Sequence, residues 1–209
     1  MDRDAVWRTI DAERAALASL LAGLDDAMWS TPSLCAGWTV RDVAAHVISS
    51  PQATLGSTVR AMVSARGDLD RALFAEARRH SARPTTQILD DFRRLAGSRR
   101  HPPGTTHLEP LLDVLVHTQD IAVPLGVEHP MPPVPCAVAA GRVWRLRYPF
   151  HARRRLTGYR LVATDTDWSV GAGPPLEGTA GALLLLVTGR TAALRRGGPR
   201  LVVRQGGLP

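Results

Sequence analysis

The sequence predicts a mainly α-helical protein that ends in a small α+β region. Through about residue 150, apolar residues recur at the three- and four-residue spacing of amphipathic helices. Beyond that point, residues 159–164 and 168–170 show a spacing typical of strands. We therefore expect two domains within the 209 residues, a helical bundle over residues 1–150 and a small α+β domain over residues 151–209.

The composition is that of a soluble globular protein, with 44% hydrophobic and 22% charged residues. The longest apolar run, Ala180 to Val187, is far shorter than a membrane span, so we expect no membrane partner. The first residues alternate acidic and basic side chains and carry no cleavable apolar segment, which predicts no signal peptide. Because two cysteines, Cys35 and Cys136, make no disulfide framework, the expected location is the cytoplasm.

The net charge of +7 raises the question of nucleic-acid binding. All 26 positively charged residues are arginine, a bias that G+C-rich codons would produce without any binding role. The densest clusters, at residues 153–155 and 195–196, contain no interleaved aromatic residues. We interpret the charge as a solvated basic face and expect no nucleic-acid partner.

The first part of the chain reads as a series of helices. A long helix from about Asp4 to Leu24 carries one apolar stripe. After a polar loop, Thr39 is placed to cap a second helix, with Asp42 at the acidic position of a capping box. On that helix His46 lies at the edge of the apolar stripe, so it could point inward or lie at the surface.

Further helices are expected on either side of a polar stretch. One carries Leu55, Val59, Met62 and Val63 at helical spacing. Residues 67–83 read as a more polar helix or a loop, residues 84–99 as an amphipathic helix, and residues 100–107 as a loop. The later elements are expected near residues 137–147 (helix), 159–164 and 168–170 (strands), 171–175 (loop), 179–188 (helix) and 201–204 (strand).

The most informative stretch runs from Leu108 to Gly126. It is a mostly apolar helix, interrupted by four polar residues at offsets of four, four and three: Glu109, Asp113, His117 and Asp120. A carboxylate and an imidazole one helical turn apart can share a divalent metal ion. The alternative is that these residues form the solvated side of an amphipathic helix, and this stretch alone leaves both interpretations open.

Three segments resemble one known family. The segment TPSLCAGWTVRDVAAHVISS at residues 31–50 resembles the metal-binding N-terminal domain of mycothiol-dependent maleylpyruvate isomerases, within the DinB-like (YfiT-like) superfamily. DVLVHTQDIAVPLG at residues 113–126 resembles the second metal motif of that family, and residues 161–190 resemble its small, sterol-carrier-like C-terminal domain. The resemblance implies a DinB-like four-helix bundle followed by a small α+β domain.

The resemblance also implies a metal site made by His46, Asp113 and His117. Three protein ligands with an open fourth position suit a catalytic Zn²⁺ ion. The characterised isomerases have the longer Glu at the position of Asp113, so Ni²⁺ or Fe²⁺ are alternative occupants. Asp120 is expected either to orient a ligand histidine or to be a plain surface acid, and Glu109 to be a first-turn acid rather than a ligand.

The function implied by the resemblance is a metal- and thiol-dependent isomerase or S-transferase. Mycothiol, the low-molecular-weight thiol of actinobacteria, would be the cosubstrate, and arginines near the cavity, with Arg41 and Arg60 as weak candidates, could pair with carboxylates of a small electrophilic substrate. The alternative is a non-catalytic protein that binds a metal or small ligand on the same bundle. Relatives in the superfamily suggest a monomer or a homodimer.

Other reactive residue types carry weaker signals. His101, His107 and His129 lie in proline-rich stretches without spaced partners and are expected at the surface. Cys35 has no histidine or acid in a recognisable sequence relation, so we expect a small apolar filler beside Trp38 rather than a nucleophile. Asp165 and Asp167 are expected to be turn residues.

Overall fold

The computed structural model describes residues 1–191 and 201–203. The chain forms two compact units, Asp2–Val127 and a second unit from Glu128 onward. We describe each unit by itself. The arginines at positions 195 and 196, and Arg204 at the end of the expected last strand, lie outside the described residues.

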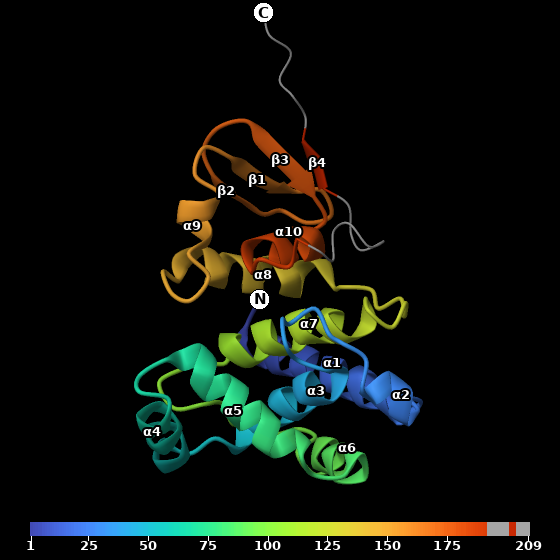
Figure 1. Cartoon of the computed structure of the whole chain (residues 1–209). Helices are drawn as coiled ribbons and strands as arrows, with labels where there is room; N and C mark the ends of the chain where they lie inside the picture. The colour runs from blue at the N-terminus through green and yellow to red at the C-terminus, as the bar shows by residue number, and fades with distance from the viewer. Residues whose placement is uncertain (192–200, 204–209) are drawn as a thin grey trace, which may run out of the picture. The chain divides into compact units, whose positions relative to one another are not determined.

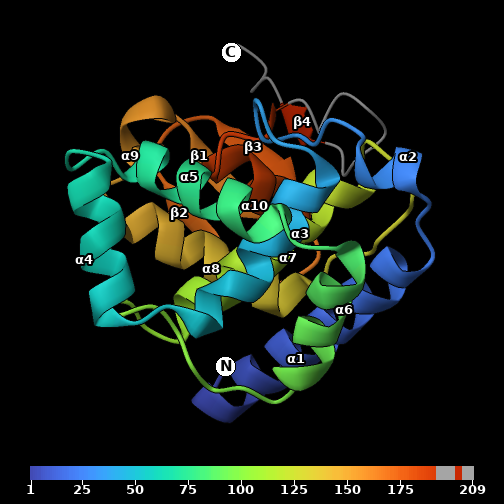
Figure 2. The ribbon, with the colours of Figure 1, turned by 60° about the horizontal axis from the view of Figure 1, so that its bottom comes forward.

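The first unit is a four-helix bundle. Helix α1 packs against α7, α7 against α3, α3 against α6, and α6 against α1, so the four helices enclose one core (Figures 1 and 2). The bundle helices are α1 (Arg3–Ala22), α3 (Val40–Ser49), α6 (Thr85–Arg94) and α7 (Leu108–Ala122). The remaining elements are α2 (Asp26–Trp29), the short 3₁₀ helix η1 (Ser50–Gln52), α4 (Leu55–Ser64) and α5 (Leu69–Ser81).

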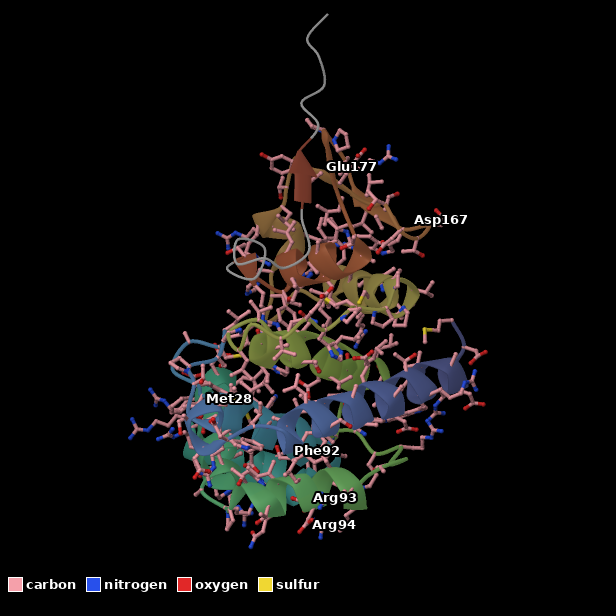
Figure 3. All side chains as sticks on the ribbon, turned by 90° about the vertical axis from the view of Figure 1, so that its right-hand side faces the viewer. Met28, Phe92, Arg93, Arg94, Asp167 and Glu177 are labelled. Atoms are coloured by element: carbon pink, nitrogen blue, oxygen red, sulfur yellow. The ribbon has the colours of Figure 1, made fainter. Side chains whose placement is uncertain are left out.

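All four bundle helices contribute to the core through the apolar stripes read from the sequence. Leu17 of α1, Val43 of α3, Phe92 of α6 and Val114 of α7 belong to one buried cluster. Figure 3 shows the same division on α6, where Phe92 is buried while Arg93 and Arg94 point away from the bundle. The expected mainly helical fold is confirmed.

The expected capping box at the start of α3 is confirmed. The Thr39 hydroxyl accepts the backbone N–H of Asp42, and the Asp42 carboxylate accepts the backbone N–H of Thr39 at 2.9 Å. These reciprocal bonds satisfy donors that a helix start leaves unpaired. The cap fixes where α3 begins, and with it the direction of His46 two turns later.

Helix α4 is confirmed, but its apolar residues do not form a buried stripe. The side chains of Leu55, Val59 and Val63 are 68%, 53% and 73% exposed. The reason is its position outside the bundle, where it packs on α5, which in turn packs on α3. The polar stretch before residue 83 is resolved as a helix, α5, and not as a loop.

The second unit combines a four-stranded sheet with helices. Strand order is β2-β1-β3-β4, with β1 and β3 parallel and the two outer pairs antiparallel. The strands are β1 (Arg160–Ala163), β2 (Ser169–Gly171), β3 (Pro175–Gly178) and β4 (Leu201–Val203), and the helices α8 (Pro133–Arg145), α9 (Ala152–Arg155) and α10 (Ala180–Val187). Strand β3 begins inside a proline- and glycine-rich segment for which we expected only a loop.

Helix α10 explains where the two units divide. All eight of its residues are buried, and it packs against α8 as well as against β1 and β3. Helix α8 therefore belongs to the second unit, and the chain divides between residues 127 and 128 rather than near residue 150, where we expected the boundary.

Asp165 and Asp167 lie in the turn between β1 and β2, as expected. Asp167, labelled in Figure 3, is exposed, whereas the Asp165 carboxylate accepts the backbone N–H of Ala180 at 2.8 Å, at the start of α10. In the part of the chain that the structure describes, no helix combines the length and the apolar character needed to cross a membrane.

Candidate metal centre

Helices α3 and α7 bring together the three residues expected to hold a metal ion. Nε2 of His46 lies 3.4 Å from Oδ1 of Asp113, and Nε2 of His117 lies 3.3 Å from the same oxygen. Asp113 and His117 are one turn apart on α7, and His46 reaches them from α3. The two imidazole rings are 5.0 Å apart and nearly perpendicular. The three side chains are 12–20% exposed, so His46 points inward rather than to the surface.

These separations fit a tetrahedral metal ion better than they fit hydrogen bonds alone. Nitrogen and oxygen ligands lie about 2.0–2.1 Å from zinc, which places two tetrahedral ligand atoms roughly 3.3 Å apart. The two measured separations, 3.3 and 3.4 Å, match that value and exceed the usual length of an N–H···O hydrogen bond. One carboxylate and two imidazoles are also a donor set that suits Zn²⁺.

In this cluster the carboxylate and the imidazoles stabilise each other's charged forms. Burial alone would raise the pKa of Asp113, but the charge of His46 and the close approach of both imidazoles hold the pKa of that carboxyl far below its usual range. Burial alone would likewise lower the pKa of His117, yet its bonds to Asp113, Asp120 and Cys35 raise that pKa well above the ordinary value. Without a metal ion, an ionised Asp113 is thus neutralised by imidazolium.

Asp120 lies behind His117 and is fully buried, so it is not a surface acid. Its Oδ2 is 2.8 Å from Nδ1 of His117, on the side of the ring opposite Asp113. A carboxylate only accepts, so Nδ1 keeps a proton, and in the neutral ring that a metal ion requires Nε2 has its lone pair toward Asp113 and His46. Glu109 instead accepts the backbone N–H of Thr106 at 2.6 Å, as expected of a first-turn acid.

Cys35 is the site residue that sequence reasoning missed. Its Sγ lies 3.1 Å from Oδ2 of Asp120 and 3.9 Å from Nδ1 of His117, so the thiol does have an acid and a histidine beside it. The expectation of a mere apolar filler was therefore incomplete. The partners are 82 and 85 residues away along the chain, which no local motif reveals.

A pocket of about 340 Å³ opens beside the cluster. His46 and Asp113 line it, together with apolar side chains of α4 and α5 such as Met62 and Leu73. Hydroxyl groups and three carboxylates add polar character, and the full lining consists of His46, Ser49, Ser50, Ala53, Ser57, Thr58, Ala61, Met62, Leu69, Ala72, Leu73, Glu76, Pro102, Pro103, Thr105, Glu109 and Asp113. Neither Arg41 nor Arg60 is among these residues.

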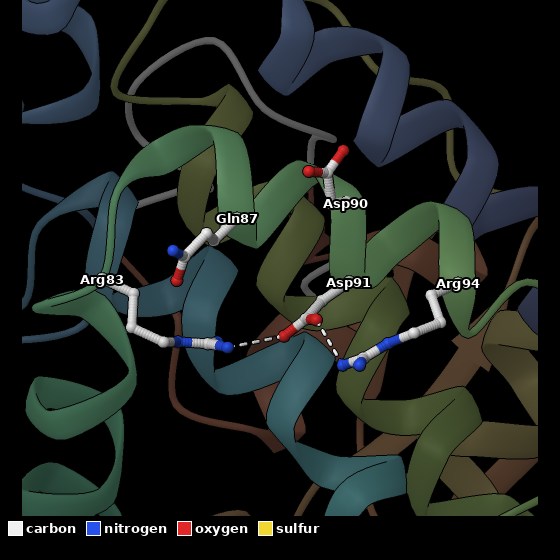
Figure 4. A pocket seen from close by; sticks show the side chains of 5 residues that line it. All are labelled: Arg83, Gln87, Asp90, Asp91 and Arg94. Carbon is white, nitrogen blue, oxygen red and sulfur yellow. Dashed lines mark hydrogen bonds and ion pairs between the residues drawn. The ribbon is translucent and has the colours of Figure 1, made fainter.

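A second hollow, of about 380 Å³, differs in character (Figure 4). It is lined by Arg83, Gln87, Asp90, Asp91 and Arg94. Asp91 accepts hydrogen bonds from Arg83 at 2.8 Å and from Arg94 at 2.5 Å, one on each carboxylate oxygen. Since arginine stays protonated and has no lone pair to donate, this cluster is an ion-pair network rather than a metal centre.

Among the described residues, the groups with metal-binding geometry are the His46–Asp113–His117 cluster and a second one, which shares His117 and is completed by Cys35 and Asp120. His101, His107 and His129 belong to neither group. His101 instead lies within hydrogen-bond distance of the Thr105 hydroxyl, at 3.2 Å, inside its own loop.

Comparison with known proteins shows the family of this chain. Residues 10–122 match the family described as the mycothiol maleylpyruvate isomerase N-terminal domain, a match over more than half of the chain. The chain belongs to this family. The matched segment contains His46, Asp113 and His117, and the resemblance read from the sequence is confirmed.

Two solved structures are similar over the whole chain. One is the crystal structure of the mycothiol-dependent maleylpyruvate isomerase, with a TM-score of 0.64 and 15% identity, covering 100% of this chain and 96% of that one. The other is a histidine-to-alanine mutant of that isomerase, with a TM-score of 0.65, 14% identity and the same coverage. At these identities the likeness shows the fold, and the family is one of enzymes. No curated protein sequence matches the chain.

Proposed function

We propose that this protein is a metal- and thiol-dependent enzyme, an isomerase or S-transferase that uses mycothiol on a small electrophilic substrate. The observation that carries the proposal is the convergence of His46, Asp113 and His117 on one point at the wall of a pocket. Membership of the mycothiol maleylpyruvate isomerase family supports the thiol and the reaction class.

In this proposal His46, Asp113 and His117 are the metal ligands. Zn²⁺ is the proposed ion, because two imidazoles and one carboxylate suit it, with Ni²⁺ and Fe²⁺ as alternatives. When bound, a divalent ion with an open coordination position lowers the pKa of a thiol so that the reactive thiolate forms at neutral pH. Asp120 holds His117 so that Nε2 faces Asp113.

Asp113 stands where the characterised isomerases have Glu. The shorter side chain requires α3 and α7 to approach closely, and the separations of 3.3 and 3.4 Å support such an approach. The proposed site therefore does not depend on the longer residue.

The pocket would hold the substrate beside the thiolate. In an isomerisation, the sulfur of the thiolate forms a C–S bond to one carbon of a cis double bond, and the π electron pair of that bond moves to the other carbon and into the electron-withdrawing group attached to it. The former double bond is then a single bond about which the substrate rotates. Breaking the C–S bond restores the double bond in the trans form and releases the thiolate. In an S-transferase, the adduct of the thiol and the substrate takes up a proton and is released as the product.

Titration of zinc-loaded protein with mycothiol in a calorimeter tests the thiol requirement. We expect saturable heat with the wild type and none with His117→Ala, which would lack the metal ion. Zinc-loaded wild type that gives no heat would overturn the proposed thiol.

Activity on maleylpyruvate separates an enzyme from a non-catalytic binding protein on the same bundle. We expect His46→Ala and His117→Ala to lose metal and activity together. Wild-type protein that binds zinc and mycothiol but turns over neither maleylpyruvate nor other small electrophiles would favour the binding protein. We further propose that the protein works in the cytoplasm, as a monomer or homodimer, without a nucleic-acid or membrane partner.

A further inference from the structure

The loop between α2 and α3 contacts both histidines of the candidate metal centre. It is closed by the backbone bond from Ser33 to Trp38, at 2.9 Å. Gly37 within it has a φ of +78°, in the left-handed region that favours glycine. At the end of the loop the Trp38 ring meets the His46 ring edge-on, at 5.3 Å between centroids, while Cys35 lies beside His117.

The loop is also attached to α7 at Asp120 through two groups. The backbone N–H of Leu34 donates to the backbone carbonyl of Asp120 at 3.1 Å, and the Cys35 thiol donates to the Asp120 carboxylate at 3.1 Å. The same carboxylate oxygen, Oδ2, also accepts from Nδ1 of His117 at 2.8 Å. Cys35, Asp120 and His117 thus form one hydrogen-bonded chain that ends at a proposed ligand.

Distances argue that this chain is not a second metal site. Ligand atoms around a tetrahedral ion would be roughly 3.3 Å apart, and further for a sulfur ligand, because Zn–S is about 2.3 Å. The separations of 2.8 and 3.1 Å from Asp120 are shorter than that and lie in the range of hydrogen bonds, with sulfur as the donor of the longer one. The two sides of the His117 ring are therefore different, with hydrogen bonds at Nδ1 and metal-like spacing at Nε2.

From this chain we infer that Cys35 is a positioning residue for the metal centre. Its thiol holds the Asp120 carboxylate in the orientation that keeps the proton on Nδ1 of His117, which directs the Nε2 lone pair toward His46 and Asp113. The inference rests on the proposed metal site, and it assigns a role to a cysteine that neither acts as nucleophile nor contacts the metal.

Three substitutions at Cys35 distinguish a thiol that acts as a hydrogen-bond donor from a side chain that only fills space. Cys35→Ser keeps an O–H donor, Cys35→Val fills the space without one, and Cys35→Ala does neither. The measurement is the zinc dissociation constant, by competition with a chromophoric chelator, and the unfolding free energy of each metal-free variant serves as the folding control. Removing an outer hydrogen-bond partner of a metal ligand typically costs 10–100-fold in affinity.

We expect zinc affinity to fall about tenfold in Cys35→Ala and Cys35→Val, and to return to within about threefold of wild type in Cys35→Ser. In an Asp120→Ala background, Cys35→Ala should cause no further loss, because the link to His117 is already broken. If Cys35 had only a structural role, the substitutions would lower the unfolding free energy, but zinc affinity would not follow the presence of a hydrogen-bond donor.

Three outcomes would contradict the inference. If Cys35→Val binds zinc like the wild type and Cys35→Ser does not, Cys35 is a filler. If all three variants bind zinc like the wild type, the thiol has no positioning role. If the wild type takes up a second equivalent of zinc that Cys35→Ala lacks, the thiol is itself a ligand. A wild type that binds no zinc would instead overturn the proposed metal site on which the inference rests.

Discussion

Asp113 and Asp91 are both aspartates that line hollows of the first unit, and both have pKa values below the ordinary range, but their partners differ. Asp91 is held by two arginines at 2.5–2.8 Å, whereas Asp113 faces two histidines at 3.3–3.4 Å. Arginine cannot release its proton in a protein and has no lone pair to offer. Histidine can release a proton, and its neutral ring then offers a lone pair to a metal ion.

The difference shows what separates a structural ion pair from a candidate metal centre. Around Asp91 the charges already pair at hydrogen-bond distance, so the cluster is complete as it stands (Figure 4). Around Asp113 the ligand atoms are spaced for an ion among them, and the protons that now neutralise the carboxylate can be exchanged for a metal. The first two predictions use substitutions that should affect one cluster and spare the other.

The largest expected effect is on metal affinity. Asp113→Asn replaces a charged ligand by a neutral amide, so we expect zinc affinity to fall by more than about 100-fold, beyond the 10–100-fold typical of a partner outside the ligand set. Asp91→Asn, the matched control, should bind zinc like the wild type. Chelator competition measures both, and equal losses in the two variants would contradict the distinction.

Asp91→Asn should instead destabilise the fold. Its carboxylate is 8% exposed and its loss leaves Arg83 without a carboxylate partner in this network. We expect about 1–2 kcal/mol in the free energy of unfolding, less than the 3–5 kcal/mol of a fully buried pair, because water screens the partly exposed arginines. Urea denaturation of metal-free protein gives the value, and Asp90→Asn, at the 67% exposed neighbour, should change it little.

Stability should also fall in acid through Asp42. Burial would raise its pKa, but hydrogen bonds from Ser81 and Thr39 and the charge of Arg78 lower it below the unfolded value. A lowered folded pKa contributes stability above the unfolded pKa of about 4, and that contribution is lost as the pH falls below it. Denaturation of metal-free protein between pH 7 and pH 3 should show a smaller loss in Asp42→Asn, which starts less stable at pH 7. Parallel curves for both proteins would contradict this assignment.

The smallest expected effect is at Glu109. Although it lines the pocket, its carboxylate accepts the N–H and hydroxyl of Thr106 at the start of α7. We expect Glu109→Gln to lower the unfolding free energy by about 0.5 kcal/mol, through weaker interaction with the helix start, and to leave zinc affinity within twofold, about the scatter of such measurements. A large loss of affinity would make Glu109 a ligand.

Features set by neighbours in the sequence could be predicted, and features set by distant contacts could not. The Thr39–Asp42 cap and the spacing of Asp113, His117 and Asp120 depend on offsets of three and four residues, which helix geometry converts directly into contacts. The pairing of His46 with that face came only from the family resemblance, because spacing within one helix cannot say which other helix lies opposite.

The missed features depend on long-range packing. The contact of Cys35 with Asp120 spans 85 residues, and the exposure of Leu55 and Val63 follows from the place of α4 outside the bundle. Helix α8 was assigned to the bundle because its apolar spacing is the same whichever partner it packs on. Strand β3, which begins at Pro175, carries loop-like residues and is formed by pairing with β1.

The central claim is that a metal ion binds at His46, Asp113 and His117. The most direct test is metal content by mass spectrometry on protein purified without a His-tag or added metal, comparing wild type, His117→Ala and the Asp91→Asn control. We predict about one equivalent of zinc, or of nickel or iron, in the wild type and the control, and none in His117→Ala. A metal-free wild type that also fails to take up added Zn²⁺, or a His117→Ala protein that keeps its metal, would contradict the claim.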